Sequence, residues 1–236
     1  MTTRAKKPLK TAKELWRDTH PDMLPPESKR EDVTVILPAL EEDKSLQELL
    51  PKLESHYKVC TRDDKGLANA VMMGVVTSAT PIVVVMDADG THSAWTVHQM
   101  VRLLDNDECD LVCGVRNAWG PGLKGVLSSE GNKLIKARLG IPVNDCTSGF
   151  FAARRSKLLK LPPSTWKGYG DYYMALLAHA HKDNWNIECV STDYQPRIAG
   201  KGHTSLMKHS LMYLRRLFRV EREIYPGMKL RGRKAK

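Results

Sequence analysis

One stretch constrains the fold of this chain more than any other, the run IVVVMDADGTH at residues 82–92. A run in which nearly every residue is Val, Ile or Met predicts a strand buried on both faces, and such strands lie inside the sheets of α/β proteins. Two carboxylates, Asp87 and Asp89, follow where the strand ends. Because ligands of open α/β sheets bind beyond the carboxyl ends of the strands, we expect these acids to bind a hard cation.

Predicted strands and helices alternate along the chain. Besides the strand just described, strands are predicted at 33–40, 57–62, 110–116 and 149–155, and helices at 41–56, 66–79, 94–105 and 129–139. This order predicts one α/β domain with a mostly parallel sheet and helices on both faces. We interpret residues 1–31 as a basic polar leader, 32–205 as the folded domain, and 206–236 as a basic amphipathic helix with a tail.

The net charge of +10 is unevenly distributed. Residues 1–17 hold six Lys/Arg against one Glu, and residues 201–236 hold eleven against two, so the ends carry +5 and +9 and the body carries −4. Two basic ends favour a polyanionic partner, either nucleic acid or an anionic membrane surface, although a solvated, frayed terminus is an equal alternative for either end alone. No obligate protein partner is indicated.

Targeting signals are not evident in the sequence. No apolar stretch approaches the roughly 20 residues that span a bilayer, and the segment MTTRAKKPLK lacks the apolar core of a signal peptide. We therefore expect a cytoplasmic protein, with peripheral membrane association as an option.

Four motifs in sequence order resemble those of one family. They are VTVILPALEEDKSLQELL (33–50), IVVVMDADGTH (82–92), CGVRN (113–117) and NDCTSGFFAARRSKL (144–158). They resemble the first-strand turn, the Asp-x-Asp motif, the Gly-Ser-Arg stretch and the acceptor segment of family 2 glycosyltransferases, which have the Rossmann-like GT-A fold. The Asp-Ala-Asp-x-x-His form is similar to that of dolichol- and polyprenyl-phosphate mannose synthases, and PRIAGKGHTS (196–205) sits where those enzymes have a loop that closes over the diphosphate.

The resemblance implies an enzyme that transfers a hexose or pentose from a nucleotide-diphosphate sugar, with inversion, using Mg²⁺ or Mn²⁺. The metal ligands implied are Asp87, Asp89 and His92, because Mg²⁺ and Mn²⁺ bind carboxylate oxygens and substrate phosphates. The resemblance implies Asp89 as the more direct ligand, with Asp87 on the ribose or on a metal-bound water. The residues implied in donor binding are Pro38, Ala39, Glu41, Asp63, Lys65, Asp87, Ala88, Arg116, Arg197 and Lys201.

Two departures from the family pattern limit what the resemblance implies. The acids that normally follow the second strand are missing from a shortened stretch, and Asp63 and Asp64 either replace them or form a polar loop. Thr204 and Ser205 stand in place of the usual Ser-Lys pair, with Lys201 upstream. The nucleobase of the donor therefore stays open.

The acceptor side is expected at the turn formed by Asp145, Thr147, Ser148 and Gly149, although an ordinary tight turn has the same composition. A hydroxyl acceptor needs a general base, whereas a lipid phosphate is already an anion. Asp171 lies at the start of a predicted helix, where hydroxyl-glycosylating relatives carry their base, and an N-cap is an equally good interpretation. Asp171 and Asp89 are thus the candidate catalytic residues.

The segment HSLMYLRRLFRVERE (209–223) leaves two acceptors open. With leucines on one side and arginines on the other, this helix can lie on an anionic membrane or can pack on the sheet and present its arginines to DNA. The basic ends, the absence of membrane spans and the candidate base favour, narrowly, a hydroxymethylated base in DNA of the bacteriophage type. The alternative is a polyprenyl phosphate at a membrane surface. A non-catalytic binding protein is a third class, which the intact acids and arginines of the motifs disfavour.

Overall fold

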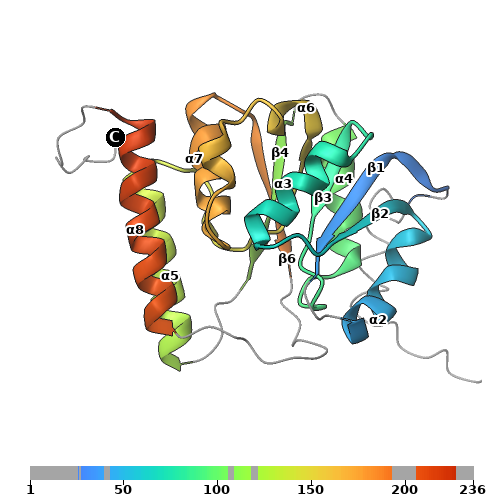
Figure 1. Cartoon of the computed structure of the whole chain (residues 1–236), viewed down its shortest axis with the longest axis horizontal. Coiled ribbons are helices and arrows are strands. Elements are labelled where there is room, and N and C mark those ends of the chain that lie inside the picture. Colours follow the sequence, from blue (N-terminus) through green and yellow to red (C-terminus); the bar gives the residue numbers. More distant parts are fainter. Residues whose placement is uncertain are drawn as a thin grey trace, which may run out of the picture.

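The computed structural model describes residues 26, 28–39, 43–105, 109–117, 122–192 and 206–226. The strands are β1 (Arg30–Pro38), β2 (Tyr57–Arg62), β3 (Ile82–Val85), β4 (Leu111–Arg116), β5 (Phe151–Arg154) and β6 (Ile187–Thr192). The helices are α2 (Asp43–Glu54), α3 (Leu67–Thr77), α4 (Ala94–Asp105), α5 (Gly122–Leu139), α6 (Arg155–Leu158), the 3-10 helix η2 (Pro163–Trp166), α7 (Tyr172–Lys182) and α8 (Leu206–Ile224) (Figure 1).

The strands form one six-stranded sheet in the order β2-β1-β3-β5-β4-β6. β1 is parallel to β2 and β3, and β4 is parallel to β6, whereas β5 is antiparallel to both of its neighbours. All strands except β5 therefore run in one direction, which confirms the predicted mostly parallel α/β sheet of the GT-A type. Pattern alone did not reveal that β5 runs the opposite way, because a short buried strand has the same composition in either direction.

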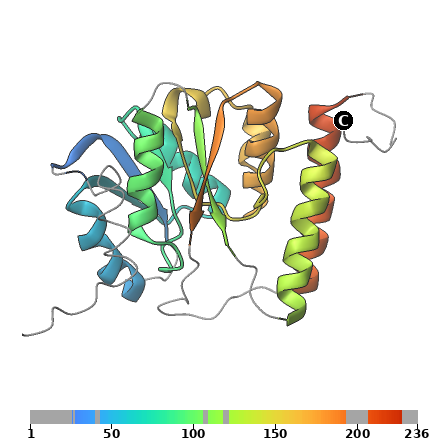
Figure 2. The same cartoon turned by 180° about the vertical axis from the view of Figure 1, so that it is seen from behind.

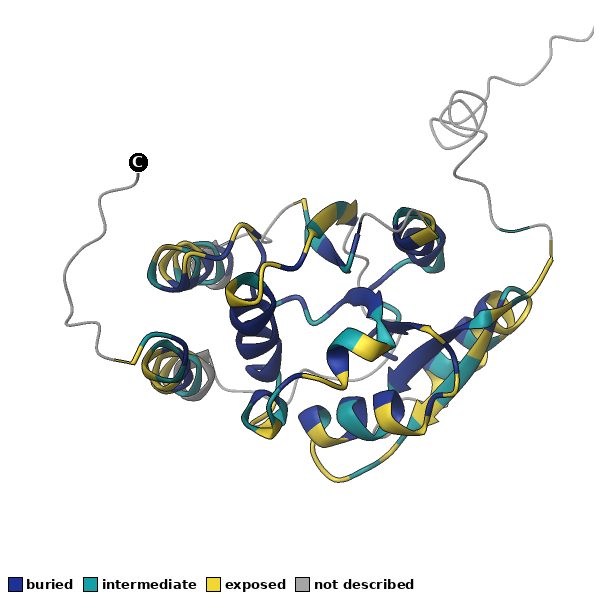
Figure 3. Cartoon of the chain, turned by 90° about the horizontal axis from the view of Figure 1, so that it is seen from above, coloured by how far each residue is buried: buried dark blue, intermediate teal, exposed yellow. Residues whose placement is uncertain are grey.

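Alternate residues of the buried strands face two separate cores. In β3, Val83 and Val85 belong to the core under α3, α5, α7 and α8, whereas Ile82 and Val84 belong to the core under α2 and α4. Figures 1 and 2 show these helices on opposite faces of the sheet, and Figure 3 shows buried residues gathered between the layers. Burial of both strand faces explains the unbroken apolar run in the sequence.

Two long helices, α5 and α8, lie side by side at one end of the molecule (Figures 1 and 2). Near their carboxyl ends, Arg138 pairs with Glu221 at 2.6 Å, and the Tyr225 hydroxyl donates to the Leu139 carbonyl at 2.9 Å. α5 begins at Gly122, well before the predicted residue 129. Its first turns are rich in glycine and carry no clear apolar stripe, so periodicity could not detect them.

The predicted C-terminal helix is present as α8, but its faces differ from the prediction. Arg216, expected on the polar side, is buried, with 4% of its surface exposed. The apolar residues divide into two groups: Leu217, Val220 and Ile224 are buried, and Leu211, Leu214 and Phe218 are exposed. α8 thus packs on the core with one stripe and leaves a second apolar stripe on the surface. In the part of the chain that the structure describes, no helix is both long and apolar enough to cross a bilayer.

Candidate active site

The predicted site residues come together at one edge of the sheet because the parallel strands end there. Ala39 follows β1, Asp63 follows β2, Asp87 follows β3, and Arg116 ends β4. The antiparallel strand β5 begins at this same edge. The turn at residues 145–149, which leads into β5, therefore lies beside the ends of the parallel strands. This is the position at which open α/β sheets bind ligands.

The loop after β2 is held by local contacts. The Ala39 amide donates to the Arg62 carbonyl at 2.8 Å, which joins the ends of β1 and β2 beside Pro38. Arg62 binds both carboxylate oxygens of Asp64, at 2.6 and 2.8 Å, and this hydrogen bonding lowers the pKa of Asp64. Asp63 beside it is exposed, and so is the predicted donor residue Lys65. The donor roles of Pro38, Ala39, Asp63 and Lys65 stay predictions.

The two carboxylates after β3 have different surroundings. The Asp87 side chain is 43% exposed, and its Oδ2 lies 3.7 Å from Nε2 of His92. Asp89 is nearly buried, and its Oδ1 accepts hydrogen bonds from the Thr91 amide at 3.0 Å and the Thr91 hydroxyl at 2.6 Å. Ala88 between them points into the core. The more accessible carboxylate is therefore Asp87, whereas the sequence favoured Asp89 as the direct ligand.

His92 is positioned by packing across the sheet. Its ring lies 4.5 Å from that of Phe150, and Phe150 in turn covers Gly114, where an added Cβ would come within 2.5 Å of the ring. In the described residues, no group of three His, Cys, Asp or Glu side chains is arranged to hold a metal ion. The roles of Asp87, Asp89 and His92 as metal ligands stay predictions.

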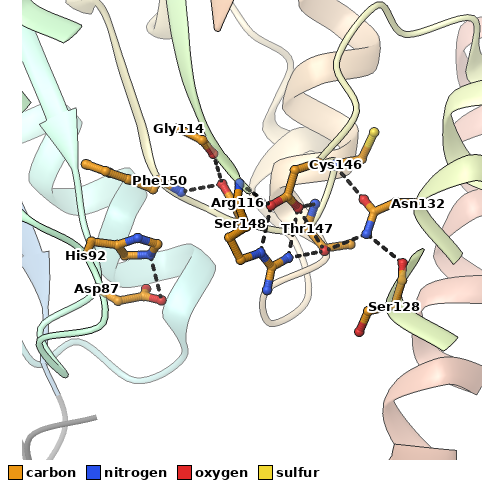
Figure 4. A network of polar contacts seen from close by, with 11 residues as sticks. Asp87, His92, Gly114, Arg116, Ser128, Asn132, Cys146, Thr147, Ser148 and Phe150 are labelled. Atoms are coloured by element: carbon orange, nitrogen blue, oxygen red, sulfur yellow. Dashed lines mark hydrogen bonds and ion pairs between the residues drawn. The ribbon is translucent and has the colours of Figure 1, made fainter. Parts of the chain in front are cut away.

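Arg116 is fixed by a buried carboxylate (Figure 4). Its Nε and Nη2 donate to the two oxygens of Asp145 at 2.7 and 2.8 Å, and its backbone amide donates to the same carboxylate at 3.2 Å. Asp145 is fully buried. Asp145 was predicted to lie on the acceptor side, and its contacts fix the orientation of Arg116. Because Nε and Nη2 donate to protein groups, a phosphate would contact the guanidinium group through Nη1.

The rest of the turn is tied to α5 and β4. Thr147 Oγ1 accepts hydrogen bonds from Arg116 Nη2 at 2.9 Å and from Asn132 Nδ2 at 3.1 Å. Ser148 donates to the Gly114 carbonyl at 2.7 Å, and Gly149 adopts φ 70°, a left-handed conformation that glycine takes without strain. Figure 4 shows these groups as one network between β4 and α5.

Asp171 precedes α7 and is almost entirely buried. It occupies the N-cap position but makes no capping hydrogen bond; its Oδ1 accepts the Tyr169 amide at 2.7 Å instead. Its Oδ2 lies 3.8 Å from Nε of Arg216 on α8, whose Nη2 donates to the Ser164 carbonyl at 2.7 Å. Burial lowers the pKa of Arg216, and Asp171 opposes this shift. These contacts tie α8 to the start of α7, and the role of Asp171 as a base stays a prediction.

A cavity of about 500 Å³ lies between α5 and α8. Leucine and isoleucine side chains line it, from Leu127, Leu134, Ile135, Leu214 and Leu217, and polar groups come from Arg116, Ser128, Glu130, Asn132, Thr147, Ser210 and Tyr213. Leu127, Leu134 and Leu214 are exposed, so the cavity opens at the surface. Arg116, which ends β4, is part of its lining.

Comparison with known sequences identifies the family. The family described as Glycosyl transferase family 2 matches residues 35–161, which run from within β1 to beyond β5 and include most of the residues just described. An uncharacterised glycosyltransferase of Mycobacterium tuberculosis is 30% identical over 200 residues, covering 73% of this chain and 89% of that protein. The chain belongs to glycosyl transferase family 2.

Two further proteins similar to this glycosyltransferase have named activities. A dolichol-phosphate mannosyltransferase of Pyrococcus furiosus is 23% identical, with 80% of this chain and 63% of that protein covered. Crystal structures of glucosyl-3-phosphoglycerate synthase from M. tuberculosis, one with Mn²⁺, UDP and product and another with Mg²⁺ and UDP, share the fold at TM-scores of 0.62 and 0.63. Their identities are 18% and 17%, with 92% and 91% of this chain and 86% and 84% of those chains covered.

Two residues of the candidate site were not predicted from the sequence, and three predicted residues cannot be compared with the structure. Asn132 and Tyr213 were not predicted, and only Tyr213 left a signal, because it precedes Leu217 by one helical turn and so shares the inward face of α8. Glu41, Arg197 and Lys201 lie outside the described residues.

Proposed function

We propose that this glycosyltransferase moves a sugar from a nucleotide-diphosphate sugar to the phosphate of a polyprenyl lipid at a membrane surface. The observation that carries the acceptor is the cavity between α5 and α8, whose lining combines leucine and isoleucine side chains with polar groups that include Arg116 and Thr147. A phosphate attached to a long hydrocarbon chain likewise combines an apolar and an anionic part.

The donor is assigned to the edge formed by the ends of β1, β2 and β3. Exposed Asp63 and Lys65 and the accessible Asp87 are there to contact a nucleotide diphosphate. Solved neighbours of the same fold contain UDP or UDP-glucose, which supports a nucleotide sugar as donor.

A divalent cation fits the same edge. Mg²⁺ and Mn²⁺ with phosphate substrates are held by one or two carboxylates, and phosphate and water oxygens complete the shell. Asp87 and Asp89 supply such a pair, and neighbours contain Mn²⁺ or Mg²⁺. Bound there, the cation would stabilise the negative charge that develops on the departing diphosphate.

The proposed transfer is a single displacement. An oxygen of the acceptor phosphate forms a bond with the anomeric carbon as the bond to the donor diphosphate breaks, and the electron pair leaves with the nucleoside diphosphate. The anomeric centre is therefore inverted. Because the acceptor is already an anion, no proton has to be removed from it. The buried Asp171, engaged by the Tyr169 amide and facing Arg216, is then a structural residue.

Arg116 connects the donor and acceptor parts of the site. It ends β4 at the donor edge, and it also lines the cavity. Asp145 holds its guanidinium group in one orientation, so Arg116 does not have to be ordered when a phosphate binds.

The outer surface of the two helices supports a membrane location for the acceptor. Apolar side chains are exposed on both helices, and three of them, Leu127, Leu134 and Leu214, line the cavity; the others are Val126 on α5 and Leu211 and Phe218 on α8. Exposed arginines accompany them on α8: Arg215, Arg219 and Arg222. A helix with this pattern suits the surface of an anionic membrane. The dolichol-phosphate mannosyltransferase relative supports the same acceptor class.

DNA, favoured narrowly by the sequence, has no support among the relatives. The charge that suggested it, +10 overall with basic ends, suits an anionic membrane equally well. The buried position of Asp171 also weakens the argument that a base awaits a hydroxyl acceptor.

One experiment tests the proposed function. The full chain is incubated with UDP- and GDP-sugars, Mg²⁺ or Mn²⁺, and one of four acceptors, and the products are weighed by mass spectrometry. The acceptors are a short-chain polyprenyl phosphate, the matching polyprenol, 3-phosphoglycerate and hydroxymethylated duplex DNA. We expect a sugar mass to be added to polyprenyl phosphate alone. Transfer to DNA or to 3-phosphoglycerate, with none to the lipid, would show that the proposed acceptor is wrong.

A further inference from the structure

Tyr213 lies on the inward face of α8. It precedes the buried Leu217 by one turn, and Leu217 and Val220 continue the stripe that packs on the core. Leu211, two residues earlier, is exposed, and Leu214 lines the cavity together with Tyr213. Tyr213 thus projects from the helix with the exposed apolar stripe towards the interior of the protein.

The Tyr213 hydroxyl can be placed from its contacts. A Cβ added to Gly170 would lie 2.9 Å from the hydroxyl oxygen, so the hydroxyl lies against the backbone just before Asp171. Tyr213 also lines the cavity together with Arg116 and Thr147. The side chain therefore connects the cavity wall to the backbone before α7, and tyrosine suits such a position because it has an apolar ring and a polar tip.

Charges from four elements surround this hydroxyl. Burial raises the pKa of Tyr213; Asp171 raises it further, Arg116 lowers it, and Asp87 and Asp145 raise it. A raised pKa keeps the hydroxyl protonated throughout the neutral range, so it remains a hydrogen-bond donor without charge. The carboxylates of Asp87, Asp145 and Asp171 repel a phosphate that approaches them. A hydrogen bond from the neutral Tyr213 hydroxyl, together with the charge of Arg116, offsets part of this repulsion.

The geometry points to Tyr213 as a positioning residue for the acceptor: its hydroxyl donates a hydrogen bond to a non-attacking oxygen of the lipid phosphate and fixes how far the phosphate enters the cavity. This inference rests on the proposed function and adds a residue to it. It also gives α8 a second role, because the helix that meets the lipid surface then contacts the reacting end of the same lipid.

The test compares Tyr213→Phe with the wild-type full chain. We expect the KM for a short-chain polyprenyl phosphate to rise about tenfold, in line with the loss of one hydrogen bond to a charged group. Metal-dependent hydrolysis of the nucleotide sugar without acceptor, and the donor KM, should stay unchanged. The preference for binding polyprenyl phosphate over polyprenol should fall, because only the phosphate accepts this hydrogen bond.

Two further variants separate positioning from packing. Gly170→Ala keeps the tyrosine at position 213, but the added methyl group displaces its hydroxyl. The acceptor KM should therefore rise in this variant too. Tyr225→Phe removes a different hydroxyl from the same helix region, one that donates to the Leu139 carbonyl, and should lower thermal stability with the acceptor KM unchanged. If Tyr213→Phe behaves like Tyr225→Phe, Tyr213 is a packing residue and the inference is wrong. If the wild-type protein hydrolyses donor but transfers nothing to polyprenyl phosphate, the proposed function fails, and this role for Tyr213 fails with it.

Discussion

The proposed donor edge, at the ends of β1, β2 and β3, and the proposed acceptor cavity, between α5 and α8, both adjoin Arg116 at the end of β4. The polar contacts that stabilise the two regions differ. On the donor side the side-chain contacts just described are local, as between Arg62 and Asp64 or between Asp89 and Thr91. On the acceptor side they join distant elements, and the Arg116–Asp145 pair links β4 to the turn before β5. The donor edge therefore depends on short stretches of sequence, and the acceptor cavity depends on the packing of several elements.

The largest expected effect tests whether the donor edge carries the chemistry. Asp89→Asn should reduce turnover at least hundredfold, because it removes a carboxylate from the predicted metal site. The fold should be preserved, since the asparagine oxygen can still accept the hydrogen bonds from Thr91. Steady-state kinetics and thermal unfolding measure the two effects. Substantial turnover at saturating Mg²⁺ or Mn²⁺ would contradict the assignment.

The second prediction compares one carboxylate from each region. Asp145→Ala leaves Arg116 without its buried partner and should lower the free energy of unfolding by about 3 kcal/mol. Asp64→Ala, the control, breaks an arginine pair on the donor edge that is more open to solvent and should change stability little. Denaturant unfolding measures both variants, and similar losses would remove the distinction between local and long-range support.

A smaller effect is expected where the two regions touch. Gly114→Ala places a Cβ within 2.5 Å of the Phe150 ring, which supports His92, and the resulting overpacking should cost about 1–3 kcal/mol of stability. Gly131→Ala on α5 is the control, because an added Cβ there meets nothing within 4 Å. Equal stability of the two variants would indicate that Phe150 moves without strain.

The smallest effect concerns the outer surface of the acceptor region. Leu211→Ser should weaken binding to anionic lipid vesicles about tenfold, because a side chain that is 49% exposed would lose its burial in the membrane. Val76→Ser on α3 changes an equally exposed apolar residue outside this surface and should leave vesicle binding unchanged. Vesicle co-sedimentation measures both, and equal binding by both variants would contradict a membrane-facing α8.

The same contrast explains what the sequence could predict. The strand before Asp87 was predictable because burial on both faces leaves an unbroken apolar run. Arg116 was placed at a strand end because a strand was predicted at 110–116. Pairwise contacts between distant segments leave no periodic signal, so the partner of Arg116 could not be identified from pattern. Arg216 was placed on the wrong face of α8 because charged residues are seldom buried, and its contacts with Asp171 and the Ser164 carbonyl make it an exception.

The position of α8 at the end of the described chain has a consequence for the order of assembly during synthesis. Chains leave the ribosome amino end first, so the strands that form the donor edge emerge before α8, whose Leu217 and Val220 complete the core beside the cavity. A nascent chain that ends before residue 206 contains the donor edge but lacks one wall of the acceptor site. The proposed binding of lipid would therefore depend on a helix that a growing chain adds after the donor edge.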